Sequence, residues 1–225
     1  MYVNRKEFVK KAVLFGGVGL FYLNGGSLLL SACKAPNLVD EAKDVSLKTF
    51  QPAYISLEAE GKFSERINKA YHILGDCQLC PRQCRVNRID GEEGFCRTTT
   101  KAVVFARQPH YGEELPLVGQ GGSGTIFFSN CNLRCVFCQN WPIAHEGRGQ
   151  EVSDEDLAGM MLDLQGMGCH NINLVTPTHV MPHILNATRL AMQQGLKLPL
   201  CYNTSGYERL EMIKLLDGVV DIYLP

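Results

Sequence analysis

Three cysteines stand within the segment CNLRCVFCQN, and no fourth cysteine lies close by. They are Cys131, Cys135 and Cys138, at the spacing C-x3-C-x2-C. Cysteines at such close spacing bind metals, and an iron-sulfur cluster normally takes four thiolates. A four-iron cluster held by three thiolates leaves one iron open, just as a catalytic zinc keeps one position open for its substrate. The segment therefore predicts a cluster that binds a further molecule.

A second cysteine group precedes the first, in the stretch CQLCPRQCRVNRIDGEEGFC. Its spacing is C-x2-C-x3-C-x11-C, and its members are Cys77, Cys80, Cys84 and Cys96. Four thiolates close tetrahedrally on zinc or hold an iron-sulfur cluster, and the pattern does not decide between the two. Two local disulfides are a further alternative if the protein is exported. We predict a second metal site with no open position.

The other features of composition carry little chemistry. Cys169 and Cys201 lie beside strand-like runs and are expected to be buried small hydrophobic residues. The histidines His145, His170, His179 and His183 are assigned no role. With 225 residues, of which 45% are hydrophobic, the chain can bury one substantial core and a small added module. A net charge of -1 gives no electrostatic argument for a nucleic-acid partner.

Residues 101–225 show the elements that must position the three cysteines. The pattern predicts strands at 103–106, 125–128, 172–175, 198–203 and 219–224, with helices at 153–168, 180–195 and 207–218. Strands that alternate with helices imply a parallel sheet, and the chemistry of such folds gathers at the carboxyl ends of the strands. The three-cysteine loop directly follows the strand at 125–128, which is where this rule places an active site.

The N-terminus has the layout of an export signal. A basic segment is followed by a mostly apolar run over 12–32, and LSAC ends at Cys33. It resembles a bacterial lipoprotein signal, with the lipid on Cys33, and NRKEF is similar to a loose twin-arginine motif. A plain membrane-anchoring helix is the alternative. We expect membrane association through residues 1–33, with a cytoplasmic protein as the other possibility.

Between the signal and the larger domain the sequence predicts two short regions. Residues 34–63 mix charged and turn-forming residues without periodicity and are expected to be a linker or a segment that wraps around the domain. Residues 64–100 are expected to form a helix, N-capped by Ser64 and ended by Gly75, followed by the four-cysteine module.

The three-cysteine loop and its surroundings resemble the radical S-adenosylmethionine superfamily. The resemblance rests on the C-x3-C-x2-C spacing, on Phe137 before the last cysteine, and on the place of the loop after the first strand of an α/β domain. Within the superfamily, the branch called pyruvate formate-lyase activating enzyme-like is most similar. The motifs for it are CQLCPRQCRVNR, GEEGFCR, GTIFFSNCNLRCVFCQNW, NLVTPTH and IYLP, and they cover 77–225 nearly continuously.

This resemblance implies a fold, cofactors and partners. The implied fold is a partial (βα) parallel barrel, of which about four strands are present, so the domain is expected to be incomplete at its C-terminus. The implied cofactors are a [4Fe-4S] cluster and S-adenosylmethionine, which the reduced cluster cleaves to a hydrogen-abstracting 5'-deoxyadenosyl radical. The implied partners are a protein substrate, of the glycyl-radical type or another, and an electron donor such as flavodoxin or ferredoxin.

The resemblance also implies positions for cofactor contacts. After the second strand of the parallel sheet the superfamily usually has Gly-Gly-Glu, which receives the methionine amino group. Here Thr176, Pro177 and Thr178 stand in its place, and their carbonyl and hydroxyl oxygens are the expected equivalents. Asn203, Thr204 and Ser205 follow the third strand, where the family contacts the ribose.

Two other functions remain open at the level of sequence. One is the same radical chemistry on a small molecule. The other is an exported iron-sulfur electron carrier or metal-binding lipoprotein. The export-like N-terminus favours the electron carrier or metal-binding lipoprotein. S-adenosylmethionine and low-potential reductants are supplied in the cytosol, so an exported domain would lack both.

Overall fold

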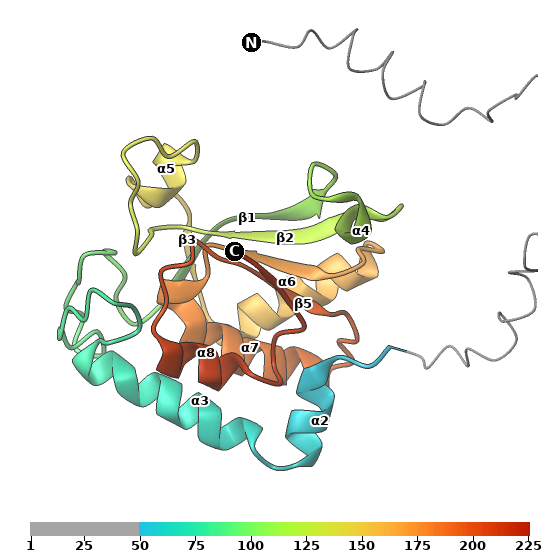
Figure 1. Cartoon of the computed structure of the whole chain (residues 1–225), viewed down its shortest axis with the longest axis horizontal. Coiled ribbons are helices and arrows are strands. Elements are labelled where there is room, and N and C mark those ends of the chain that lie inside the picture. Colours follow the sequence, from blue (N-terminus) through green and yellow to red (C-terminus); the bar gives the residue numbers. More distant parts are fainter. Residues whose placement is uncertain (1–49) are drawn as a thin grey trace, which may run out of the picture. The chain divides into compact units, whose positions relative to one another are not determined.

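A computed structural model gives the fold, and it describes residues 50–225. The predicted signal segment and most of the predicted linker lie outside the described residues. One mixed sheet of six strands, in the order β3-β1-β2-β4-β5-β6, forms the framework (Figure 1). Its strands are β1 (Ala102–His110), β2 (Ser123–Phe128), β3 (Gln150–Val152), β4 (Ile172–Val175), β5 (Leu200–Asn203) and β6 (Ile222–Leu224).

Four neighbouring strands, β2, β4, β5 and β6, run parallel, and they correspond to the last four strands predicted from the sequence. The register aligns their ends: Phe127 pairs with Val175, and Val175 pairs with Asn203. Because parallel strands point the same way, the segments after β2, β4 and β5 emerge at one edge of the sheet. The predicted α/β class is confirmed, and this edge carries the candidate site.

The sheet differs from the predicted fold at its other side. Strand β1 is antiparallel to β2, and β3, which was not predicted, is antiparallel to β1. The chain turns back between β1 and β2 at one end of the sheet without the covering crossover that a parallel pair needs. A strand of three residues such as β3 is too short to show a periodic pattern. The sheet is therefore mixed, and closure of the fold into a partial barrel stays a prediction.

Three helices connect the parallel strands and lie together beside the sheet (Figure 1). They are α6 (Asp154–Gly166), α7 (Met181–Gln193) and α8 (Leu210–Leu216). The predicted start of α6 is confirmed, because the Ser153 hydroxyl accepts from the Asp156 N–H and the Asp156 carboxylate accepts from the Ser153 N–H. Their buried faces meet those of the strands in one apolar core, which includes Ile126, Leu174 and Leu200.

Two further helices, α2 (Ala53–Ala59) and α3 (Phe63–His72), pack outside this layer, with α3 against α7 and α8. Of the two expectations for residues 34–63, α2 agrees with the wrapping segment rather than with the linker, because Tyr54 and Leu57 are buried in the core. A helix of seven residues shows too few apolar positions for its period to be recognised. Helix α3 begins one residue before the predicted cap Ser64 and passes through the 3-10 turn η1 (Ile73–Asp76) into the four-cysteine segment.

In the part of the chain that the structure describes, every helix is too short or too polar to cross a membrane.

Candidate metal and cofactor site

The three-cysteine loop lies at the carboxyl end of β2 and is held by its own backbone. The Cys138 N–H donates to the Cys135 carbonyl at 3.1 Å. The Leu133 N–H donates to Cys131 Sγ at 3.3 Å. Hydrogen bonds from N–H groups to sulfur stabilise thiolates and tune the clusters that they hold. These two hydrogen bonds therefore fix the backbone of the loop around Cys131.

The short helix α5 (Trp141–Ala144) and the residue after it also support this loop. The Asn130 N–H donates to the Ile143 carbonyl at 2.9 Å, and the His145 Nε2 lies 3.0 Å from the Cys135 carbonyl. Because a carbonyl only accepts, this ring nitrogen carries its proton. The Trp141 and His145 rings stack with centroids 3.6 Å apart. Together these contacts fix the position of Cys135.

The donor set of this loop fits a three-thiolate cluster. Cys131 is buried, and burial raises the pKa of its thiol, whereas Cys135 and Cys138 are half-buried. As the side chains lie, no group of three or more Cys, His, Asp or Glu within residues 50–225 is arranged to hold a metal ion. The fit rests on the chemistry: three free thiols on one loop, with an N–H directed at the most buried sulfur.

The predicted cofactor contacts come together at the ends of β4 and β5. The Thr176 N–H donates to the Asn203 carbonyl at 2.9 Å, so the segments 176–178 and 203–205 are neighbours. Thr178 is buried, and its hydroxyl donates to Glu208 Oε1 at 2.6 Å, while Ser205 is exposed. The structure thus brings the two predicted segments to one edge, next to the three-cysteine loop.

Glu208 is a site residue that the sequence analysis missed. Its carboxylate accepts from both Thr178 and Thr204. The neighbouring Tyr207 carbonyl accepts from Asn132 Nδ2 at 3.0 Å, which ties this segment to the three-cysteine loop. The only signal in the sequence was an acidic residue soon after a predicted strand, and such residues are common.

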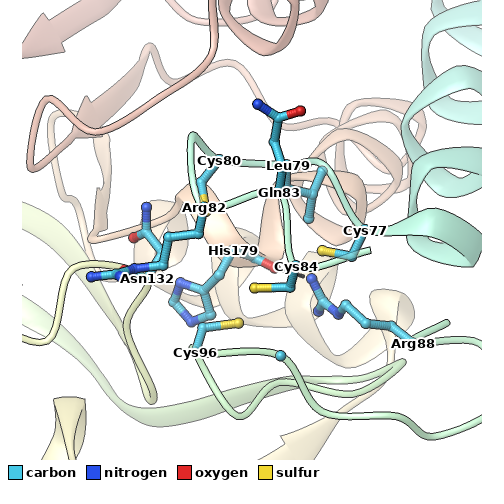
Figure 2. A pocket seen from close by; sticks show the side chains of 11 residues that line it. Cys77, Leu79, Cys80, Arg82, Gln83, Cys84, Arg88, Cys96, Asn132 and His179 are labelled. Carbon is cyan, nitrogen blue, oxygen red and sulfur yellow. Dashed lines mark hydrogen bonds between the residues drawn. The ribbon is translucent and has the colours of Figure 1, made fainter. Parts of the chain in front are cut away.

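The four upstream cysteines line one small cavity, together with side chains from the larger domain (Figure 2). The cavity has a volume of about 10 Å³, and Arg82, Arg88, Asn132 and His179 are among its other lining residues. The Phe95 N–H lies 3.4 Å from Cys84 Sγ. Burial raises the pKa of the Cys80 thiol. All nine cysteines of residues 50–225 are free thiols.

The wall of this cavity contains buried polar atoms without partners. They are Arg88 Nη2, Asn132 Oδ1 and His179 Nδ1. Arg88 is fully buried, and its other hydrogen bonds go to the carbonyls of Thr99 and His179 rather than to a carboxylate. Leaving a buried polar group unsatisfied costs about 1–3 kcal/mol. Three of them around one cavity indicate that a charged or polar group completes it.

Backbone strain is concentrated in the same regions. Six residues other than glycine have positive φ in the described chain, between 43° and 68°, a range that side chains disfavour. Five lie beside or between the cysteines of the two groups, and the sixth follows β4. They are Gln83, Arg85, Arg97, Asn130, Arg134 and Thr176. Such strain persists only where the surrounding structure enforces it, and it is frequent at functional sites.

Comparison with known proteins relates part of the chain to a family. The family model described as the radical SAM superfamily matches residues 125–224, the stretch from β2 to β6. Residues 125–224 are a radical SAM domain. The radical SAM domain contains the three-cysteine loop, the ends of β4 and β5, and Glu208. The superfamily implies a [4Fe-4S] cluster and S-adenosylmethionine as its cofactors.

Two curated relatives, both uncharacterized proteins of Methanocaldococcus jannaschii, resemble the chain. One is 33% identical over 167 residues, which are 71% of this chain and 47% of that protein. The other is 26% identical over 159 residues, which are 62% of this chain and 46% of that protein. The chain thus spans about half the length of the curated relatives it matches. No solved structure matches the chain.

Proposed function

We propose that the radical SAM domain holds a [4Fe-4S] cluster on Cys131, Cys135 and Cys138 and binds S-adenosylmethionine at the edge formed by β2, β4 and β5. Such a cluster, when bound and reduced, would supply the electron for cleavage of S-adenosylmethionine to methionine and a 5'-deoxyadenosyl radical, the species that would abstract hydrogen from a substrate. The observation that carries the proposal is the Asn132–Tyr207 hydrogen bond. It holds the three-cysteine loop beside the segment that carries Glu208.

The chain's own residues would orient the cofactor. Two segments carry the predicted contacts. One directly follows β4 and consists of Thr176, Pro177 and Thr178, and the other lies at the end of β5 and consists of Asn203, Thr204 and Ser205. Glu208 sits between the two threonines and adds a negative charge. A carboxylate is the natural partner for the positive charges of S-adenosylmethionine, its ammonium and its sulfonium. Thr178 and Thr204 hold this carboxylate in place.

We further propose a protein substrate and a protein electron donor, as in the activating-enzyme-like branch that the motifs resemble. The support is the tip of the three-cysteine loop, where Val136 and Phe137 are 85% and 86% exposed. Large exposed apolar side chains next to a redox centre suit a contact with another protein. A second metal on Cys77, Cys80, Cys84 and Cys96 completes the proposal.

The test is cleavage of S-adenosylmethionine. The protein is reconstituted anaerobically with iron and sulfide, reduced with dithionite and incubated with the cofactor, and 5'-deoxyadenosine and methionine are measured by chromatography. We expect both products, formed slowly without substrate. The variant with Cys131, Cys135 and Cys138 all changed to alanine is expected to form neither. Changing Cys169 to alanine is the matched control and is expected to have no effect.

Two results would contradict the proposal. One is product formation by the triple variant at the unchanged rate. The other is absence of 5'-deoxyadenosine from a protein with a verified four-iron cluster, which would favour an electron carrier instead.

A further inference from the structure

The cavity between the four upstream cysteines has the size of a single ion. A volume of about 10 Å³ holds about one water-sized atom, which suits a single ion. The turn from Cys80 to Cys84 is closed by a hydrogen bond from the Gln83 N–H to the Cys80 carbonyl at 3.0 Å. Gly94 faces the same space, since a Cβ there would lie 3.0 Å from Cys84 Sγ. The walls leave little room to expand.

The unpartnered atoms around this cavity favour a cation. His179 Nε2 lies 2.8 Å from the Ser129 carbonyl and must carry the ring proton, so its Nδ1 has a free lone pair. Asn132 Nδ2 donates to the Tyr207 carbonyl, so its orphaned Oδ1 is likewise an acceptor. Both residues line the cavity with the four thiols. Two acceptors therefore line the cavity beside the four thiols, and both suit a cation.

Arg88 supplies the compensating charge. Four thiolates on a divalent ion carry a net charge of -2, and burying such a charge requires a counter-charge. Arg88 is fully buried, lines the cavity and has Nη2 free to donate to a sulfur. A lone buried guanidinium is unfavourable by itself, and an anionic metal centre accounts for it.

The same cavity is linked to the three-cysteine loop through Arg82. Arg82 Nε donates to the Asn132 carbonyl at 2.7 Å, and its Nη2 donates to the Leu133 carbonyl at 3.3 Å. The guanidinium carbon lies 3.3 Å from the centre of the Phe95 ring, next to Cys96. Arg82 itself stands between Cys80 and Cys84. An ion that fixes Cys80 and Cys84 would therefore also fix Arg82, whose guanidinium group holds the three-cysteine loop.

We infer that Cys77, Cys80, Cys84 and Cys96 bind a single tetrahedral divalent ion of the zinc class, with His179 and Arg88 around it, and that this ion positions the three-cysteine loop through Arg82. The second half rests on the proposed function, because it takes that loop as the cluster site. As the side chains lie, the four thiols are not arranged to hold an ion, so the inference requires rotation about their Cα–Cβ bonds to other staggered positions. The ion replaces the thiol protons on binding.

The first experiment uses the variant with Cys131, Cys135 and Cys138 changed to alanine, which lacks the proposed cluster site. Purified after expression with zinc and iron, it is expected to contain one metal ion per chain and no acid-labile sulfide. Adding Cys80→Ser and Cys84→Ser is expected to remove the ion, whereas Cys169→Ser is expected to retain it. Absence of metal, or a cluster with sulfide, would overturn the inference whether or not the protein cleaves S-adenosylmethionine.

Affinity gives a milder probe that leaves every cysteine in place. Competition with a zinc-binding dye measures the affinity for zinc. We expect His179→Asn and Gly94→Ala each to weaken this affinity about 10- to 100-fold, the loss that is typical when a group around the direct ligands is changed. Circular dichroism checks that both variants stay folded. Unchanged affinity in both folded variants would contradict the proposed surroundings of the ion.

The link to the loop is tested with Arg82→Gln in the otherwise natural chain. This variant is expected to keep the single ion but to take up less than half of the iron and sulfide during reconstitution. Arg85→Gln is the matched control, because Arg85 is exposed and pairs with Asp76 rather than with the loop. Equal iron and sulfide uptake by Arg82→Gln and the natural chain would refute the positioning role.

Discussion

At the scale of single residues, Glu208 determines the charge of the proposed cofactor edge. Its carboxylate accepts from two hydroxyl groups, on Thr178 and Thr204, and those two residues come from the exits of different strands. A carboxylate held by two donors is oriented before any ligand arrives. The hydroxyl groups of Thr178 and Thr204 both donate to this carboxylate, so their role at the edge depends on Glu208.

We predict that Glu208→Gln weakens binding of S-adenosylmethionine by about 10- to 100-fold, the loss expected for a hydrogen bond to a charged group of about 1.5–3 kcal/mol. Glutamine keeps the shape but removes the negative charge. Equilibrium dialysis against the reconstituted protein measures the binding, and iron content shows that the cluster is intact. Glu211→Gln is the control, because the Glu211 side chain is 62% exposed. Equal binding by both variants would exclude Glu208 from the cofactor site.

At the scale of elements, a buried polar network joins three helices. Asp154 at the start of α6 accepts from His183 Nδ1 at 2.8 Å and from Asn186 Nδ2 at 2.6 Å, both on α7. The Tyr71 hydroxyl of α3 also donates to it. Burial by itself raises the pKa of Asp154, but the hydrogen bonds from His183, Tyr71 and Asn186 outweigh this effect and lower it. The network therefore stabilises the ionised carboxylate.

We predict that Asp154→Asn lowers the free energy of unfolding by about 2 kcal/mol at pH 7, because buried partners lose a charged acceptor. A carboxyl group whose pKa is lowered by folding contributes stability above its unfolded pKa, about 4, and loses it as the pH falls through the folded value. The difference between the natural protein and the variant should therefore shrink below pH 4. Urea unfolding at pH 7 and at pH 3 measures it.

Glu155→Gln is the matched control for that experiment, since Glu155 is exposed in the same first turn of α6. An Asp154→Asn variant as stable as this control at pH 7 would show that the network contributes no net stability.

At the scale of the whole molecule, the location of the radical SAM domain depends on the N-terminal segment. The predicted lipid attachment at Cys33 lies outside the described residues. We propose that the N-terminal segment attaches the protein to a membrane while the domain faces the cytoplasm, where S-adenosylmethionine and reductant are available.

We predict that deleting residues 1–33 moves the protein from the membrane fraction to the soluble fraction, because the mostly apolar run over 12–32 is long enough to hold the chain in a bilayer. Fractionation followed by immunoblotting measures the shift, with the natural chain as the control. Protease added to spheroplasts should leave the domain intact. Digestion in spheroplasts would place the domain outside and contradict the proposed orientation, and a soluble natural protein would contradict the attachment.

The sequence alone was sufficient for features that are local along the chain. The three-cysteine spacing, the start of the helix at Ser153 and the alternation of strands and helices each depend on residues within a few positions of one another. Their physical causes, ligand spacing and side-chain periodicity, act over the same short range. The superfamily and the parallel strands β2, β4, β5 and β6 were predictable for this reason.

The tertiary structure alone decided which distant residues meet. Arg82 reaches a carbonyl 50 residues further along, Thr178 and Glu208 are 30 residues apart, and His179 lines a cavity made mainly by residues 77–96. The antiparallel pairing of β1 with β2 and β3 was likewise decided there. Such meetings depend on the order of strands in the sheet and on packing of the helices beside it. No local pattern encodes either of these, because each is set by the burial of many residues at once.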